Sequence, residues 1–130
     1  MKWMTTREVE RAAKKGPLAA LDNSIEKWTQ MRDAPAQELK AKLKRTSGFD
    51  AGAFCALCVR HPGCVNCTFL TISKVRCYYI GWGAYMAARN KWLWRDGPIA
   101  PVRKAIRTLI RNMKKARKLL VEQLKENTGA

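Results

Sequence analysis

Histidines and acidic residues are scarce in this chain of 130 residues, which has one His and ten Asp and Glu in total. A single histidine, His61, leaves no basis for a Ser/His/Asp set, and no Glu stands beside it as in the zinc deaminases. A Gly-x-x-x-x-Gly-Lys loop for nucleotide phosphates is also missing. These absences argue against catalysis, and we expect a protein that is not an enzyme.

Long apolar runs are missing as well. No run approaches the roughly 18 residues that cross a bilayer, and the first residues lack the apolar segment of a signal peptide. The cysteines number five, and an odd number does not suit a complete set of disulfides. In a reducing cytosol, paired cysteines are metal ligands more readily than disulfides. We therefore expect a soluble cytoplasmic protein without a membrane partner.

Acidic residues are also unevenly spread, since none occurs between residues 51 and 95. Lys and Arg together number 26, which gives a formal net charge of +16 and a pI near 10.2. Such an excess indicates a polyanionic partner, and a nucleic acid is the simplest candidate. The hydrophobic content of 47% is that of a globular protein, so the charge does not belong to a wholly disordered basic tail.

All five cysteines lie between residues 55 and 77. Cys55 and Cys58 form one Cys-x-x-Cys pair. A loop of five residues separates it from a second pair, Cys64 and Cys67. Each tight turn lets its two sulfurs face the same way, so four thiols can reach one point. That arrangement suits a tetrahedral structural metal, and we predict one Zn²⁺ per chain bound by these four cysteines.

The spacing leaves the ligand set open. Cys77 could replace Cys64 in a larger loop, and His61 lies three residues from both Cys58 and Cys64. With an all-cysteine set available, His61 is more readily explained as a surface loop residue. An iron–sulfur cluster, a redox disulfide and unliganded thiols are the other interpretations. If zinc takes four cysteines, the site is closed to substrate.

Hydrophobic spacing predicts a mainly α fold of four to five helices, stapled by the small zinc module. Residues 1–47 should form N-terminal helices, the first of which begins with a capping box of Thr5 and Glu8. Its weak apolar face suits an arm that packs late or only on binding. Pro17 opens a second helix and Pro35 a third, shorter one.

The second helix carries a core-facing stripe and an outer face that we expect to be solvated. The stripe consists of Leu18, Leu21, Ile25 and Trp28, and the outer face of Asp22, Glu26, Lys27 and Arg32. Residues 48–77 form the predicted zinc module. Within it, residues 68–76 have enough β-branched side chains for a short β-ribbon, although an extended connection fits equally well.

Residues 78–95 are rich in alanine and aromatics and are predicted to be helical, despite Gly81 and Gly83. These glycines weaken a helix or mark the close approach of a neighbouring element. The aromatics are Tyr78, Tyr79, Trp82, Tyr85, Trp92 and Trp94. They could form a stacking platform for unpaired bases, or they could fill the core of a small helical domain. The second interpretation is the stronger one.

A long amphipathic helix is predicted over residues 99–126. Its apolar stripe is Val102, Ile106, Leu109, Met113, Ala116, Leu120 and Leu124, which we expect to pack against the second helix. The candidate nucleic-acid ligands on its other face are Arg103, Lys104, Arg107, Arg111, Lys114, Lys115 and Lys118, joined by Arg76 and Arg89. So many cations on one face repel one another, and this favours a nucleic-acid backbone as the partner.

The cysteine arrangement supports a family resemblance. Cys-x-Leu-Cys from Cys55, Cys-x-x-Cys from Cys64, the further Cys77 and the preceding Ile25-Glu-Lys-Trp28 resemble small cysteine-rich bacteriophage proteins, mostly without assigned function. The resemblance covers about residues 18–80. It implies a phage or prophage origin, and hence a bacterial host cell, together with a metal-bound cysteine cluster. It carries no activity with it.

Together these features predict a single domain, residues 1–130, that acts by binding. The first hypothesis is a non-catalytic, zinc-stabilised basic protein that binds the backbone of DNA or RNA. The alternative is a phage inhibitor or adaptor that docks on a host nuclease or defence complex. Both hypotheses use the same basic surface.

Overall fold

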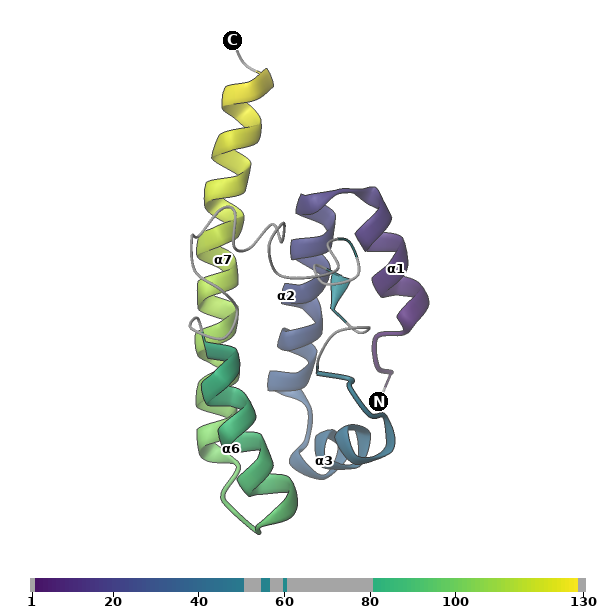
Figure 1. Ribbon diagram of the computed structural model, residues 1–130, viewed down its shortest axis with the longest axis vertical. Helices are drawn as coiled ribbons and strands as arrows, with labels where there is room; N and C mark the ends of the chain where they lie inside the picture. Colours follow the sequence, from purple (N-terminus) through teal and green to yellow (C-terminus); the bar gives the residue numbers. More distant parts are fainter. Residues whose placement is uncertain (1, 51–54, 57–59, 61–80, 129–130) are drawn as a thin grey trace.

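A computed structural model describes residues 2–50, 55, 56, 60 and 81–128 of the chain. Five helices lie in this part of the chain: α1 (Thr6–Lys15), α2 (Pro17–Asp33), α3 (Ala36–Arg45), α6 (Gly83–Trp94) and α7 (Ala100–Thr128). The described residues contain no strand, and the prediction of a mainly α fold is confirmed. Figure 1 shows α2 between α1 on one side and α7 on the other, with α3 and α6 at the lower end.

Helix α1 begins with the predicted capping box. Thr5 Oγ1 accepts a hydrogen bond from the backbone N–H of Glu8 at 3.2 Å, and Glu8 Oε1 accepts one from the N–H of Thr5 at 3.4 Å. Val9 and Ala13 are buried where α1 packs on α2, and the Arg60 guanidinium donates to the carbonyl of Ala13 at 2.8 Å. The expectation of an arm that packs only on binding is therefore wrong, because even this narrow apolar face is covered. Late packing during folding stays a prediction.

Helix α2 is buried on more than the one predicted face. It packs on both α1 and α7, and the Trp28 ring stands edge-on to Tyr85 of α6 with their centroids 4.8 Å apart. A second buried stripe consists of Ala20, Ser24, Lys27 and Met31. Lys27 is only 1% exposed, so the prediction of a solvated position is wrong. A helix at the centre of a bundle has neighbours on both sides, and one stripe does not describe it.

Helix α3 begins at Ala36, with Pro35 as its N-cap residue rather than its first helical residue. Its buried residues are Leu39 and Leu43, which are four positions apart and therefore lie on one face of the helix. The predicted short β-ribbon and most of the zinc module, residues 48–77, lie outside the described residues. The helical parts of the predicted organisation are confirmed, and the module itself stays a prediction.

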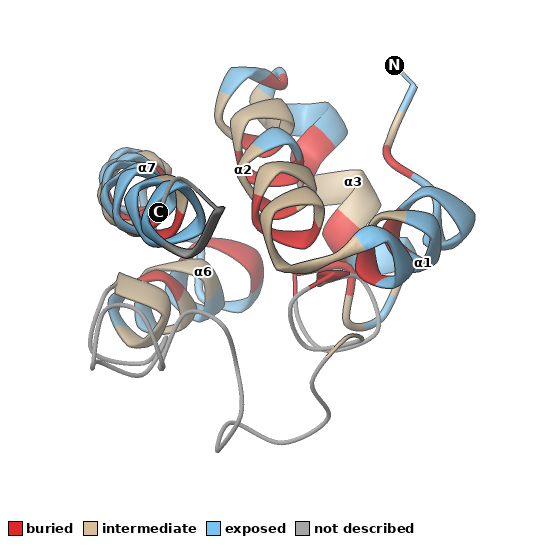
Figure 2. Cartoon of the chain, turned by 90° about the horizontal axis from the view of Figure 1, so that it is seen from above, coloured by how far each residue is buried: buried red, intermediate tan, exposed pale blue. Residues whose placement is uncertain are grey.

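Helix α7 packs its apolar stripe against α2, as predicted, and also against α6. The stripe is buried from Val102 to Leu120, whereas Leu124 is exposed near the end of the helix. Figure 1 shows the last turns of α7 running past the end of α2. Viewed from above in Figure 2, the exposed residues of α7 cover the side away from α2. The orientation of the apolar stripe thus decides which residues of α7 face solvent.

Gly81 lies just before α6, where the chain approaches α7. Its φ is 132°, and a Cβ placed there would lie 3.3 Å from Cγ of Leu109. A side chain at this position would be both strained in its backbone and crowded by α7. The prediction that the glycines of this segment mark a close approach is confirmed at Gly81.

Within the described ranges, no helix combines the length and the apolar character that are needed to cross a membrane.

Two leucines on α7 provide a test of this packing. Leu109 is 1% exposed and Leu119 is 45% exposed. We expect Leu109→Ala to lower the free energy of unfolding by about 2–5 kcal/mol, because it leaves a cavity at the contact with Gly81. Leu119→Ala, the same substitution on the same helix, should change it by less than about 0.5 kcal/mol. Urea denaturation of both variants measures the difference, and equal effects would contradict the orientation of α7.

Candidate nucleic-acid interface

Five cations on α7 form the largest group of predicted ligands that the structure brings together. They are Arg107, Arg111, Lys114, Lys115 and Lys118, and all five side chains are exposed. Apart from the adjacent Lys114 and Lys115, steps of three and four residues separate them, so they lie along one face of the helix, opposite the buried stripe. We call these five residues the α7 basic row.

A surface groove runs beside the α7 basic row. It has a volume of about 490 Å³ and is lined by the whole row together with Ile110 of α7 and Arg32 of α2. Its walls therefore carry six cationic side chains and no acidic one. A groove of this kind suits an elongated polyanion better than a small neutral ligand.

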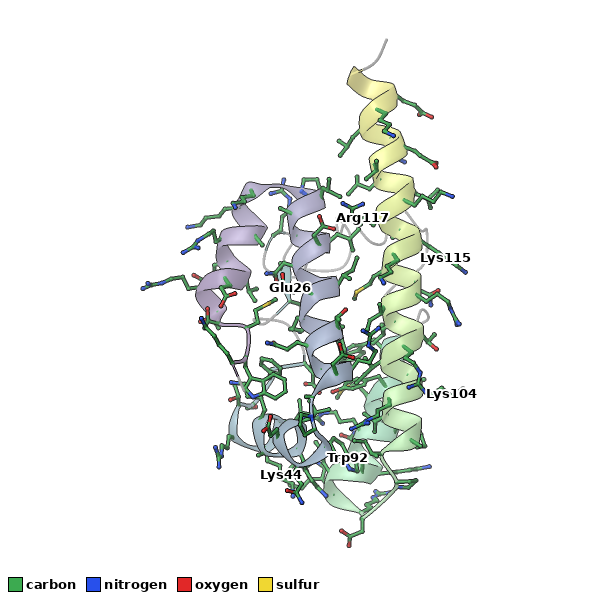
Figure 3. All side chains as sticks on the ribbon, turned by 180° about the vertical axis from the view of Figure 1, so that it is seen from behind. Glu26, Lys44, Trp92, Lys104, Lys115 and Arg117 are labelled. Atoms are coloured by element: carbon green, nitrogen blue, oxygen red, sulfur yellow. The ribbon has the colours of Figure 1, made fainter. Side chains whose placement is uncertain are left out.

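The α7 basic row is not neutralised by nearby carboxylates. All ten Asp and Glu side chains of the chain belong to the described residues, where the ion pairs are Arg32–Asp33, Arg89–Asp50 and Arg117–Asp22. None of the three involves a member of the row. Figure 3 shows Arg117 reaching toward α2, whereas Lys104 and Lys115 project away from it.

The paired cations next to the row behave differently. Arg117 Nε lies 2.5 Å from Asp22 Oδ1, and this hydrogen bond raises the pKa of the Arg117 guanidinium. In the same way, the hydrogen bond from Arg32 holds the pKa of Asp33 below its usual range. Both pairs are exposed to solvent, where ion pairs contribute little to stability. They reduce the positive charge at the edges of the groove and leave it intact along the row.

Four other predicted nucleic-acid ligands are not part of the row. Lys104 is exposed on α7 three residues before Arg107 and on the same face, but it does not line the groove. Arg103 is half-buried, and its Nη2 donates to the carbonyl of Ala34 at the end of α2, at 3.4 Å. Arg76 lies outside the described residues. Arg89 belongs to a buried polar cluster, which the sequence did not reveal.

The buried polar cluster is centred on Asp50, whose side chain is 3% exposed. Tyr85 Oη donates a hydrogen bond to Asp50 Oδ2 at 2.6 Å, and Arg89 Nε lies 2.6 Å from the same oxygen. The indole N–H of Trp82 donates to the carbonyl of Asp50 at 3.3 Å. A carboxylate that is withdrawn from water needs such partners, and α6 supplies two of them, Tyr85 and Arg89.

Lys27 extends this cluster onto α2. Its Nζ donates to the carbonyl of Phe49 at 3.1 Å and lies 5.2 Å from the centroid of the Trp28 ring. The backbone at residues 49 and 50 is thus held by α2 on one side and by α6 on the other. Cys55, the first of the five cysteines, follows Asp50 by five residues. The sequence signal for the cluster was the lone Asp50 between Glu38 and Asp96.

Cys55 is the one predicted metal ligand within the described residues. It is half-buried, and its Sγ lies 3.7 Å from Oγ of Ser24 on α2. Cys58, Cys64, Cys67, Cys77 and His61 lie outside the described part of the chain. Among the described residues, no group of three or more His, Cys, Asp or Glu could hold a metal ion. The sulfur-rich donor set still fits zinc by its chemistry, and the ligand assignment stays a prediction.

Comparison of the chain with protein-family models, with curated proteins and with solved structures gives no match.

Tyr85 provides a test of the buried polar cluster. We expect Tyr85→Phe to lower the free energy of unfolding by about 1–3 kcal/mol, because Asp50 stays buried with one donor fewer. Burial, followed by the charge of Asp50, raises the pKa of Tyr85 well above its ordinary value of 10.0. The folded state therefore keeps the Tyr85 proton above the pH at which the unfolded chain loses it. The contribution of the protonated phenol to the free energy of unfolding is present below pH 10 and falls as the pH rises further.

Urea denaturation between about pH 8 and pH 11 measures this effect, since the ordinary tyrosine pKa of about 10 lies inside that range. The parent protein should lose stability above pH 10 more steeply than Tyr85→Phe, which has no phenol at this position. Equal slopes for the two proteins would show that Tyr85 titrates freely, in conflict with its buried bond to Asp50.

Proposed function

We propose that this chain is a non-catalytic nucleic-acid-binding protein whose α7 basic row contacts the phosphate backbone of DNA or RNA. The observation that carries the proposal is the groove beside the row, which is lined by six cationic side chains and no acidic one. Each phosphate that these side chains neutralise would release condensed counterions. That release supplies affinity without reading a base sequence, so the binding is tolerant of sequence.

The geometry of the row suits a backbone. From Arg107 to Lys118 the helix rises by about 17 Å at ~1.5 Å per residue. Phosphates along one strand of duplex DNA are spaced by about 3.4 Å of helix axis, so several of them can lie beside the row. Arginine forks can bind phosphate oxygens in pairs, and lysines act as point charges.

A run of charges is commonly explained as a solvated helix face. On α7 that explanation leaves the repulsion between like charges uncompensated. Arg107 and Arg111, Arg111 and Lys115, and Lys114 and Lys118 are like-charged pairs four residues apart. Each such pair destabilises an isolated helix by about 0.2–0.5 kcal/mol. No carboxylate forms an ion pair with the row, although every acidic side chain of the chain is described. A polyanionic partner removes this repulsion.

The proposal includes one structural zinc ion bound by Cys55, Cys58, Cys64 and Cys67. The start of the segment that would hold it adjoins the bundle: Asp50 is fixed before it, and Cys55, its first cysteine, contacts Ser24. Zinc would supply a cross-link for a segment rich in small and polar residues, because the binding free energy of a structural zinc is folding free energy. Four thiolates around Zn²⁺ carry a net charge of −2, which nearby cations such as Arg60 offset.

Two charge-matched variants test the role of the α7 basic row. In the first, Arg107, Arg111, Lys114 and Lys118 are all replaced by Gln; in the second, Arg7, Arg11, Lys14 and Lys15 of α1 are replaced by Gln. Each lowers the formal charge of +16 by four, and Figure 1 shows that α1 and α7 lie on opposite sides of the molecule. We expect the α7 variant to lose duplex binding at about 0.15 M salt, while the α1 variant keeps most of it.

Fluorescence anisotropy with a labelled duplex, measured over a series of salt concentrations, gives the result. The slope of log K against log salt should fall in magnitude by about three to four for the α7 variant, because each phosphate contact contributes about 0.9. Equal effects of the two variants would show that only net charge matters. A protein partner that stays bound after nuclease treatment would instead support the alternative, docking on a host complex.

Cysteine variants test the zinc site. The native protein should contain about one zinc per chain, and replacing both Cys55 and Cys58 by Ser should remove it and lower the melting temperature sharply, since the cross-link is lost. Cys77→Ser is the control that keeps the proposed ligands, so it should retain the metal. Elemental analysis and circular dichroism measure both effects. Unchanged melting in the double variant would contradict a structural metal, and loss of zinc in Cys77→Ser would change the ligand set.

A further inference from the structure

Trp94 is the most exposed of the large hydrophobic residues that the structure describes. Its relative exposure is 63%, although the two residues before it, Trp92 and Leu93, are both buried. It is the last residue of α6, and its neighbours anchor the backbone from which the indole projects. The chain therefore holds a large aromatic ring in solvent at a fixed place, which the burial of apolar surface does not explain.

A cation accompanies this ring. Lys44 Nζ of α3 lies 5.1 Å from the centroid of the Trp94 ring, and one turn earlier Lys40 Nζ lies 5.6 Å from the centroid of Trp92. Figure 3 shows Lys44 and Trp92 at the same end of the molecule. These contacts place α3 beside the end of α6. The contact between Lys44 and Trp94 pairs the exposed indole with a side chain that can also bind a phosphate.

The surroundings of Trp94 are mainly cationic. Lys91 and Arg95 of the same segment are exposed, and Lys44 contacts the ring from α3. Asp96 is the nearest acid in sequence, and it forms none of the ion pairs found among the described residues. An aromatic ring surrounded by cations is the combination that binds single-stranded nucleic acid, where the bases stack and the backbone is neutralised.

The position of Trp94 relative to the α7 basic row allows one ligand to reach both. Helix α7 begins at Ala100, six residues after Trp94, at the end of the molecule where α6 finishes (Figure 1). From Ala100 to Arg107 the helix rises by only about 10 Å. Arg103, between them, contacts the carbonyl of Ala34 and so joins the first turn of α7 to the end of α2, next to α3.

We propose that Trp94 stacks on an unpaired base of a single-stranded nucleic acid. Lys44 and Arg95 contact the phosphates next to that base, and the α7 basic row holds the strand beyond it. In a duplex each base is stacked on its neighbours and offers no free face, so the ring adds affinity for single strands alone. This inference rests on the proposed function and specifies its substrate as nucleic acid with unpaired bases.

The test compares two probes of equal length, a twelve-nucleotide oligo(dT) and a twelve-base-pair duplex, at one salt concentration. Trp94→Ala should weaken oligo(dT) binding by about five- to hundredfold, the range that loss of one stacked base produces, and should leave duplex binding within about twofold. Trp94→Phe keeps an aromatic face and should retain most of the affinity. Leu119→Ala, which removes an exposed apolar side chain elsewhere, should affect neither probe.

Tryptophan fluorescence provides a second measurement. Oligo(dT) should quench the emission of the parent protein through the stacked Trp94. This quenching should be lost in Trp94→Phe, because the four tryptophans that remain do not stack on the base. Thermal melting of each variant confirms that it is folded. Unchanged oligo(dT) affinity in Trp94→Ala, or an equal loss for both probes, would overturn the inference.

The two proposals fail in different ways. If the α7 variant loses duplex binding and Trp94→Ala behaves like the parent protein with both probes, the stacking inference is wrong and the proposed function stands. If Trp94→Ala weakens oligo(dT) binding and the α7 variant has no effect on either probe, the stacking inference is supported and the α7 basic row is not the interface.

Discussion

The apolar seam between α2 and α7 is the constraint on which the rest of this structure depends. Once Ile106 and Leu109 are buried against the bundle, the helical period turns Arg107 and Arg111 toward solvent, because they lie on the face of α7 that points away from the helices it packs on. The basic row is therefore a consequence of core packing. A nucleic-acid backbone would then meet cations carried on a preformed helix, so the entropic cost of ordering on binding would fall on their side chains and not on the backbone.

The buried polar cluster has a different role from the seam. It fixes the backbone at Phe49 and Asp50 with Lys27 from α2 and Tyr85 from α6, before the cysteine segment begins. Buried charges are costly unless each has its partner, so the cluster ties these elements to one arrangement. A zinc module attached at this point would be positioned relative to both helices. Through that attachment, binding of the predicted metal would stabilise the whole bundle.

The sequence predicted the helices well where the signal was local or periodic. The capping box at Thr5 and Glu8 and the stripe from Val102 to Leu120 are both present, and the α7 basic row lies on the expected face. It failed where long-range packing decided the outcome. Lys27 was expected in solvent and is buried, because the sequence of α2 does not show that the chain returns over its second face. Arg89 could not be recognised as the partner of Asp50, since 39 residues separate them.

By itself, the sequence determined the helical class, the amphipathic last helix, the large positive charge and the concentration of cysteines, since each depends on composition or on spacing within one segment. Only the tertiary structure decided which cations stay unpaired, which carboxylate is buried and which tryptophan faces solvent. Tyr85, Trp92 and Trp94 look alike in the sequence, yet the first two are buried and the third is exposed beside Lys44. The physical reason is that burial depends on which elements meet, and the periodicity of a single helix does not contain that information.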